Sequence, residues 1–196
     1  MPRKYSKERR TASIDETRDR IINATMVLHD EKGILSTSMQ DIAARAGVAL
    51  GTVYRHFPSL DDLVPACGTR KMELNPPPTA EAFAGLVDEA RIATLYAALY
   101  AHYEATERGY FVGYAEASKL PVLKSFMEEA DAYRRSLVAE AMRPFPASEQ
   151  DMGLAVAMAD FYTWFAFYRA GYSSAAAAEV AADIVVRQVG RQEAGA

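Results

Sequence analysis

The chain has 196 residues, half of them apolar, which allows one or two domains with a hydrophobic core. Its formal net charge of −4 argues against a protein that binds nucleic acid over its whole surface. Cys67 is the single cysteine of the sequence, which excludes an internal disulfide and CxxC metal or redox chemistry.

The first thirty residues do not have the pattern of a signal peptide, because no apolar stretch of secretory length follows the basic residues. The most apolar stretch, 154–168, contains Asp160 and is too short to span a bilayer. We therefore expect a cytoplasmic protein without a membrane partner.

Charge is divided unevenly along the chain. Residues 1–71 carry 12 Lys/Arg and 9 Asp/Glu, a net of +3, whereas the remainder carries 10 and 17, a net of −7. A basic end on an acidic body is typical of a protein that meets nucleic acid at one end. A solvated, disordered basic tail explains the same composition equally well.

Turn and cap signals predict helices throughout and no strand. In chain order, Ser13-Ile14-Asp15-Glu16 has the pattern of a capping box that begins a first helix, and Gly33 ends it. A second helix is expected to start at Thr37 or Ser38 and to stop before Gly47, and further helices are expected at 50–56 and 59–74.

The clearest break is Asn75-Pro76-Pro77-Pro78, because proline lacks an amide donor and disfavours helix in the residue before it. It divides the chain into domains of residues 1–75 and 76–196. Helices are expected beyond it at 80–106, 110–118, 121–142, 149–170 and 174–190, with Ser148 and Ser173 or Ser174 as N-caps. The predicted fold class is all-α.

Residues 37–57, TSMQDIAARAGVALGTVYRHF, have the pattern of a helix-turn-helix with Gly47 in the turn. Its apolar residues can face inward together: Ile42, Ala43, Val48, Val53 and Phe57. The second helix then presents a polar side that fits the major groove of B-DNA. Two short helices alone would favour a generic helical hairpin, so the order of residues has to decide.

That order resembles the DNA-binding domain of the tetracycline-repressor (TetR/AcrR) family between Thr17 and Leu63. The matching residues are Arg20-Ile21-Ile22, Ala24, Gly33, Asp41-Ile42-Ala43, Ala46-Gly47-Val48, Gly51-Thr52-Val53-Tyr54-Arg55-His56-Phe57 and Asp62-Leu63. The resemblance covers about a quarter of the chain. It implies an N-terminal three-helix DNA-binding domain followed by a larger helical domain for ligand binding and dimerisation.

The resemblance also implies which residues contact DNA. These candidates are Thr37, Ser38, Arg45, Leu50, Gly51, Thr52, Tyr54, Arg55 and His56. Two positions depart from the family: Ala49 replaces the usual hydroxyl cap, and Leu60 replaces a phosphate-binding lysine, which should weaken binding. An N-terminal arm with Arg9 or Arg10 in the minor groove is one way to compensate.

The predicted helix at 149–170 is apolar nearly all round, so it needs partners on two sides. With the helix at 174–190 it suits a two-fold interface between two copies, and the resemblance implies the same mode of dimerisation. The candidate interface residues are Met152, Val156, Val180, Ile184 and Val185. A buried core helix in a monomer is the alternative.

Aromatic residues are concentrated after residue 80, and most must belong to the core. The resemblance implies an effector pocket among them, which would suit a lipophilic molecule, neutral or cationic. The candidate lining residues are Tyr100, Tyr103, Phe126, Tyr162, Trp164 and Phe165. Asp160 is expected to pair with an arginine such as Arg135 or Arg169, or to lie at an exposed edge of the interface.

The predicted function is a ligand-responsive transcriptional regulator, a repressor by the family's habit, that binds a palindromic operator as a homodimer. No enzyme is expected, because the chain lacks a catalytic triad order, a carboxylate pair and an HExxH motif. No cofactor or metal is expected either. A helical binding protein whose helix-turn-helix no longer reads DNA is the remaining alternative.

Overall fold

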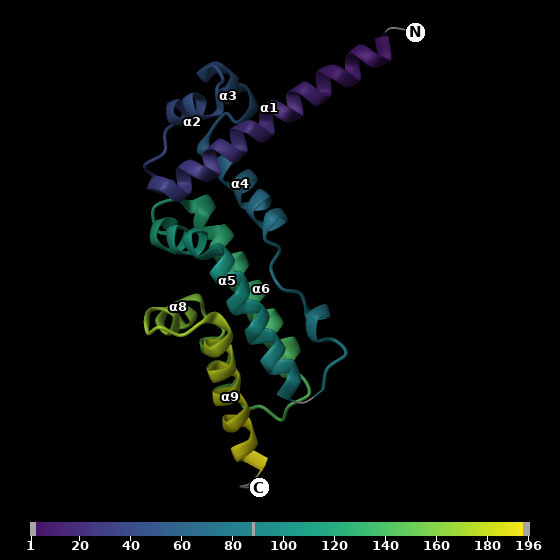
Figure 1. The fold of residues 1–196 in the computed structure, drawn as a ribbon, viewed down its shortest axis with the longest axis vertical. Coiled ribbons are helices and arrows are strands. Elements are labelled where there is room, and N and C mark those ends of the chain that lie inside the picture. The colour runs from purple at the N-terminus through teal and green to yellow at the C-terminus, as the bar shows by residue number, and fades with distance from the viewer. Residues whose placement is uncertain (1–2, 88, 194–196) are drawn as a thin grey trace. The chain divides into compact units, whose positions relative to one another are not determined.

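The computed structural model describes residues 3–87 and 89–193, and side chains from residue 12 to 190 except residue 88. Within those ranges the regular elements are all helical, and the all-α prediction is confirmed (Figure 1). None of the described helices has the length and hydropathy to cross a membrane. The chain divides into two compact units, and each is described by itself.

The first unit contains the described residues up to Leu74 together with Phe111–Met127. Its helices are α1 (Arg3–Lys32), α2 (Met39–Ala46), α3 (Leu50–His56) and α4 (Leu60–Leu74). One apolar core joins them, formed by Ile21, Ile22, Leu28, Ile42, Ala43, Val53, Phe57, Leu63 and Cys67. α2 and α3 have only eight and seven residues, so they depend on this shared core for their stability.

The predicted start of the first helix is wrong. α1 already begins at Arg3, and the Ser13 carbonyl accepts a 2.8 Å hydrogen bond from the Thr17 hydroxyl inside the helix. The predicted end is confirmed, since Gly33 follows α1 with a left-handed φ of 89°. The proposed arm residues Arg9 and Arg10 lie outside the residues whose side chains the structure describes.

The second unit contains Asn75–Tyr110 and the described residues from Glu128 onward. Its elements are the 3₁₀ turn η1 (Ala80–Phe83) and the helices α5 (Glu89–Ala117), α6 (Pro121–Met142), α7 (Glu149–Met158), α8 (Phe161–Arg169) and α9 (Ser174–Glu193). The last turns of α5 and the first turns of α6 belong to the first unit. The predicted division at residue 75 does not place them there.

Three helices predicted beyond residue 75 are corrected. The segments 80–106 and 110–118 are not separate helices, because α5 continues through Gly109 without a break. The segment 149–170 is not one helix, because α7 ends before Ala159 and α8 begins after Asp160. Asp160 causes this break by accepting the Tyr162 amide as the N-cap of α8.

Asp160 pairs with Arg134, not with Arg135 or Arg169 as predicted. Arg134 and Arg135 are adjacent in α6, so the choice of partner depends on which side of that helix faces Asp160. The predicted cap at Ser148 is confirmed, with a capping box to Asp151.

Candidate nucleic-acid interface

The helix-turn-helix is held by local hydrogen bonds that the sequence motif specifies. Ser38 caps α2: its hydroxyl accepts the Asp41 amide, and the Asp41 carboxylate accepts the Ser38 amide in return. Gly47 ends α2 with φ 64°, a conformation that favours glycine. The Val48 amide then donates to the Ala43 carbonyl at 3.0 Å, which sets the direction of the chain into α3.

α3 has one buried side and one exposed side. Val53 and the following Phe57 are buried in the core, at 0% and 1% exposure. Leu50 and Tyr54 lie beside this buried side and are 39% and 48% exposed. Of the other candidates, Gly51 and Arg55 are exposed, and Thr52 and His56 are half-buried. The structure thus brings the α3 candidates together on or beside one solvent-facing surface.

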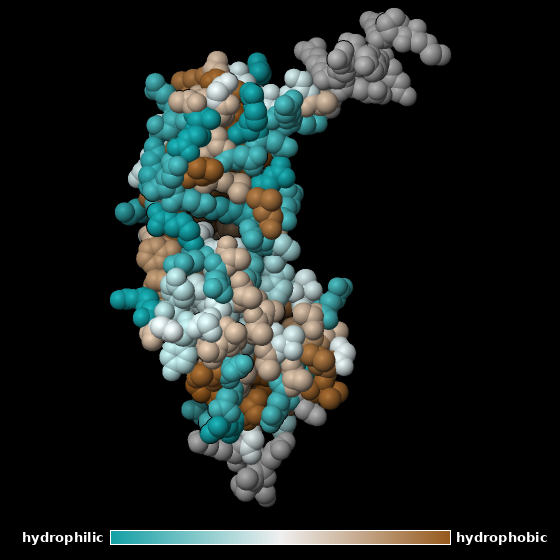
Figure 2. Space-filling view, viewed as in Figure 1, coloured by the Kyte–Doolittle hydropathy of each residue, from teal (hydrophilic) through white to brown (hydrophobic). Residues whose placement is uncertain are grey.

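Ala49 precedes α3 without a side-chain cap, as the sequence predicted. Leu60, the second departure from the family pattern, is half-buried at the start of α4. On the face shown in Figure 2, hydrophilic residues dominate the surface of the helix-turn-helix unit, with single hydrophobic side chains among them.

Thr37 is not available for a phosphate contact in this structure. It is only 3% exposed, and its hydroxyl donates to the Gly33 carbonyl at 2.7 Å. Ser38 is exposed, but its hydroxyl is engaged with Asp41 in the cap of α2. From the sequence, either Thr37 or Ser38 can be expected to contact a phosphate, and only their burial in the structure distinguishes them.

Arg45, another candidate, is held by an acidic partner. Its guanidinium donates two hydrogen bonds to the Glu31 carboxylate, at 3.0 and 2.6 Å. These bonds hold the pKa of Glu31 below its ordinary value and raise that of Arg45. Nearby, hydrogen bonds from Lys32 and from Ser38 lower the pKa of Asp41. Exposed ion pairs therefore border the proposed contact surface.

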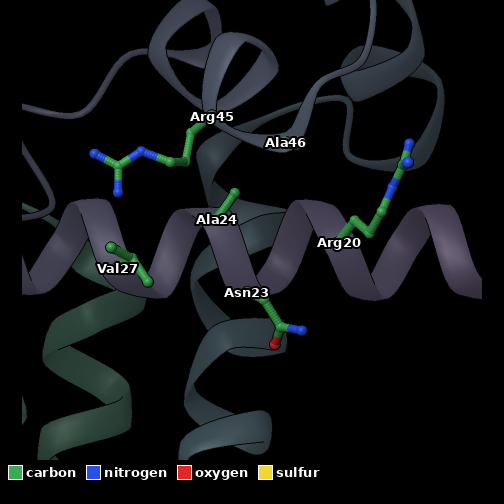
Figure 3. A pocket seen from close by; sticks show the side chains of 6 residues that line it. All are labelled: Arg20, Asn23, Ala24, Val27, Arg45 and Ala46. Atoms are coloured by element: carbon green, nitrogen blue, oxygen red, sulfur yellow. The ribbon is translucent and has the colours of Figure 1, made fainter.

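A shallow groove of about 310 Å³ lies between α1 and the end of α2. It is lined by Arg20, Asn23, Ala24, Val27, Arg45 and Ala46. Figure 3 shows Arg20 and Arg45 toward its two ends, with the small side chain of Ala24 between them. Sequence reasoning matched Arg20 to the family pattern without assigning it to a surface, and it passed over Asn23.

Four of the six candidate effector residues are brought together: ring centroids are 6.3 Å apart for Tyr100 and Tyr103, 6.0 Å for Tyr103 and Trp164, and 6.3 Å for Trp164 and Phe165. Tyr100, Tyr103 and Trp164 are buried in the second unit, and Phe165 is half-buried there. Tyr162 is 49% exposed. Phe126 belongs to the first unit, where its ring lies 2.7 Å from the position of a Cβ on Gly68.

The buried polar ends of these residues are engaged with other helices. Tyr100 donates to the Met158 carbonyl at 2.7 Å and Tyr103 to the Ala159 carbonyl at 2.8 Å. Trp164 donates its indole N–H to the Ser174 hydroxyl at 3.0 Å. Burial raises the pKa of both tyrosines, so they remain neutral donors. These side chains hold the core of the second unit together.

The candidate interface residues differ in exposure. Val185 is fully buried within its own unit, so its side chain is not available to a second copy. Ile184 is 39% exposed, and Met152, Val156 and Val180 are half-buried. Three tyrosines of the same region, Tyr162, Tyr168 and Tyr172, are each more than two-fifths exposed. Sequence reasoning did not assign these tyrosines to an interface.

The N-terminal part of the chain is similar to known regulatory proteins. The family model of bacterial regulatory proteins of the tetR family matches residues 21–67. The transcriptional repressor KstR of Rhodococcus jostii is 41% identical over 58 residues, which are 30% of this chain and 27% of that protein. KstR of Mycobacterium tuberculosis is 37% identical over 78 residues, 39% of this chain and 36% of that protein. The chain therefore matches only about a third or less of the length of these relatives.

Solved structures are similar over most of the chain. A transcriptional regulator from Rhodococcus sp. Rha1 aligns with a TM-score of 0.67 and 22% identity, over 88% of this chain and 95% of that one. The multidrug binding protein EbrR, complexed with imidazole, aligns with a TM-score of 0.61 and 23% identity, over 89% and 90% of the two chains. At these identities the likeness is one of fold.

Proposed function

We propose that the chain is a ligand-responsive transcriptional repressor of the tetR family of bacterial regulatory proteins, whose family model matches residues 21–67. It binds a palindromic DNA operator as a homodimer, with α3 in the major groove. A small lipophilic effector in the second unit releases it. Its place of action is the cytoplasm, where such an operator lies.

The observation that carries the proposal is the two-sided character of α3. Val53 and Phe57 fix the helix to the core, and this leaves Gly51, Tyr54 and Arg55 facing solvent. A helix of this kind offers side chains to base edges and phosphates without disturbing its own packing. Thr37 is left out of the proposed contacts because its hydroxyl is buried.

Dimerisation follows from how operators are read. Two recognition helices about 34–36 Å apart meet successive major-groove faces, so a two-fold protein matches a palindromic site. The exposed Ile184 of α9 and the exposed Tyr162 and Tyr168 of α8 support an interface on these helices. An exposed group of large apolar and aromatic side chains is typical of a contact surface.

The effector proposal depends on the aromatic interior of the second unit. Tyr103, Tyr110 and Phe161 have ring centroids 5.1 to 5.6 Å apart, and Trp164 lies 5.5 Å from Phe161. A lipophilic molecule, neutral or cationic, suits such surroundings. EbrR, which shares the fold, has been crystallised with proflavin.

Fluorescence anisotropy with labelled duplexes, at two salt concentrations, tests the proposal. Duplexes drawn from the region upstream of the gene should include one that binds with a Kd well below 1 µM, with affinity that falls steeply with salt. Arg55→Ala should weaken binding by about tenfold and lower the salt slope. The matched control Arg143→Ala, which removes a 73% exposed arginine of the second unit, should leave both unchanged. Kd values of about 1 µM or weaker on every duplex would contradict the proposal.

A further inference from the structure

Glu116, in the last turn of α5, holds the loop that leads into the helix-turn-helix. Its carboxylate Oε2 accepts two backbone hydrogen bonds, from the amides of Ile34 and Leu35, both at 2.9 Å. All three residues belong to the first unit. Successive amides that point at one anion form a concave anion site in the backbone, and here the anion is a side chain of the protein itself.

Gly33 is shaped to this contact. It has a φ of 89°, and a Cβ at this position would lie 2.3 Å from the Glu116 Oε1 atom. The backbone conformation favours glycine, and a Cβ here would force the Glu116 carboxylate to move from its present position. A carboxylate this close to the chain leaves no space for the loop to shift while the contact persists.

The clamped loop is connected directly to the start of α2. The Thr37 amide donates to the Ile34 carbonyl at 3.1 Å, and the Thr37 hydroxyl donates to the Gly33 carbonyl at 2.7 Å. The next residue, Ser38, is the N-cap of α2. The position of α2 is therefore tied to Glu116 through an unbroken series of hydrogen bonds.

The earlier part of α5 is anchored just as firmly, within the second unit. Tyr96, Tyr100 and Tyr103 donate their hydroxyls to carbonyls at the end of α7, at 2.8, 2.7 and 2.8 Å. The accepting residues are Ala155, Met158 and Ala159, next to the break before α8. Three tyrosine hydroxyls thus fix the earlier part of α5 to the end of α7. Thirteen residues beyond Tyr103, the Glu116 carboxylate fixes the last turn of α5 to the loop that leads into the helix-turn-helix.

We propose that Glu116 is a positioning residue. Through its contact with the loop, α5 couples the break between α7 and α8, in the second unit where the proposed effector binds, to the helix-turn-helix. The inference rests on the proposed function, since it states how that function is regulated. A shift or rotation of α5 that follows a change at the α7 end moves the carboxylate away from Ile34 and Leu35. The loop is then released, and α2 and α3 lose the fixed orientation that groove binding requires.

Hydrogen exchange of the full chain without DNA tests this clamp, by which we mean the hold of the Glu116 carboxylate on the amides of Ile34 and Leu35. In Glu116→Ala, exchange of the Ile34 and Leu35 amides should rise by about tenfold, which corresponds to the loss of one charge-assisted hydrogen bond. Glu116→Gln keeps an acceptor oxygen, so it should restore part of the protection. Glu104→Ala, at an exposed glutamate of the same helix, is the matched control and should change neither amide. Unchanged exchange in Glu116→Ala would overturn the clamp.

A double-mutant cycle tests the approach of Glu116 to Gly33. Gly33→Ala introduces both a backbone penalty and the clash with Oε1, and the clash disappears when Glu116 is alanine. Gly33→Ala should therefore shift the denaturation midpoint less in the Glu116→Ala background than in the native chain. Equal shifts in both backgrounds would show that the two groups are not in contact.

The coupling itself is tested by adding an operator duplex. Because coupling between two sites is reciprocal, DNA should slow exchange at residues 155–159 of the effector unit in the native chain and in Glu104→Ala. In Glu116→Ala, DNA should still slow exchange in α3 but no longer at 155–159. A residue that only stabilised the loop would not separate these two responses.

The outcomes of the duplex experiment are distinct. If DNA binds and the response at 155–159 persists in Glu116→Ala, or is missing in the native chain, the coupling is overturned while the proposed function stands. If no duplex binds, the proposed function and the coupling both fail. The exchange of Ile34 and Leu35 without DNA still decides whether the clamp exists.

Discussion

The two units place their polar side chains differently. In the first, charges are paired on the surface above an apolar core, as in Lys32–Asp41 and Arg45–Glu31, whose side chains are 36% to 52% exposed. In the second, the arginines Arg91 and Arg134 are 6% and 8% exposed. There the hydroxyls of Tyr96, Tyr100 and Tyr103 also donate hydrogen bonds to helix carbonyls.

The polar groups of the two units therefore differ in how much they contribute to stability. An exposed ion pair contributes little to stability because water and salt screen it. A buried donor that loses its acceptor, or a carbonyl that loses its donor, costs much more because no water replaces the bond. The first unit therefore has charges that can be exchanged for contacts to DNA, and the second has polar groups that specify where its helices end.

Arg91 provides the largest expected effect. Its guanidinium donates to the carbonyls of Phe83, Leu86, Glu140 and Ala141, at 3.0 to 3.4 Å. We expect Arg91→Met to lower the free energy of unfolding by about 3–5 kcal/mol, because several carbonyls and the Glu140 carboxylate lose a buried partner.

Urea denaturation followed by circular dichroism measures this loss. The control is Arg143→Met, which removes an arginine that also pairs with Glu140 but is 73% exposed, and its effect should stay below about 0.5 kcal/mol. Equal losses of unfolding free energy in Arg91→Met and Arg143→Met would contradict the distinction between buried and exposed polar groups.

His29 is an exception in the first unit, because it is a titratable side chain inside the apolar core. It is 4% exposed, and its Nε2 has no hydrogen-bond partner among the residues described. Burial, together with the positive charge of Lys71, lowers its pKa from 6.5 to about 4. As the pH falls, the unfolded chain therefore takes up a proton before the folded chain does.

Stability from this group is complete above pH 6.5 and is lost as the pH falls toward 4, by up to ~3 kcal/mol. The free energy of unfolding, measured by urea denaturation between pH 7 and 4, should decline accordingly. His29→Phe should flatten this part of the profile. A native profile as flat as that of the variant would show that the imidazole is not buried in neutral form.

Tyr103 tests the hydroxyl anchors of the second unit. Tyr103→Phe removes the donor to the Ala159 carbonyl and leaves the ring packing intact, so we expect a loss of about 1–2 kcal/mol in unfolding free energy. Tyr133→Phe is the control, since its exposed hydroxyl donates to the Pro78 carbonyl at 3.1 Å. Thermal unfolding of both variants should show a clear shift for Tyr103 only, and the reverse order would refute the anchoring role.

The smallest expected effect concerns the surface pair beside the proposed DNA contacts. Glu31→Gln removes a negative charge near DNA and weakens the hold on Arg45. Affinity for the operator should therefore rise by about two- to fivefold at low salt and by less at high salt. Glu129→Gln, at an exposed glutamate of the second unit, should leave affinity unchanged. Weaker binding by Glu31→Gln in the anisotropy assay would mean that the pair orients Arg45 for contact.

Much of the first unit was predictable because its signals are local. The Ser38 capping box, the left-handed Gly47 and the inward positions of Val53 and Phe57 all lie within twenty residues. Such signals act through the backbone geometry of one or two turns, so the sequence predicts them without knowledge of distant contacts. The same local order carries the family resemblance.

Local signals were misleading at two places in the chain. The serine and carboxylate at Ser13 and Glu16 have the pattern of a cap, yet α1 passes through them. The segment 149–170 has the pattern of one apolar helix, yet Asp160 breaks it by capping α8 and pairing with Arg134. In both cases the same residue pattern also occurs in chains that form the predicted cap or the predicted single helix.

The sequence by itself determined the all-α class, the helix-turn-helix and the polar side of α3, since these depend on periodicity and on caps within a few residues. Only the tertiary structure decided which polar groups are buried and what they bind. Glu116 and Ile34 are 82 residues apart, and Tyr103 and Ala159 are 56 apart. A hydrogen bond between such residues depends on how helices pack, and that depends on the shape of the whole core and not on any one segment.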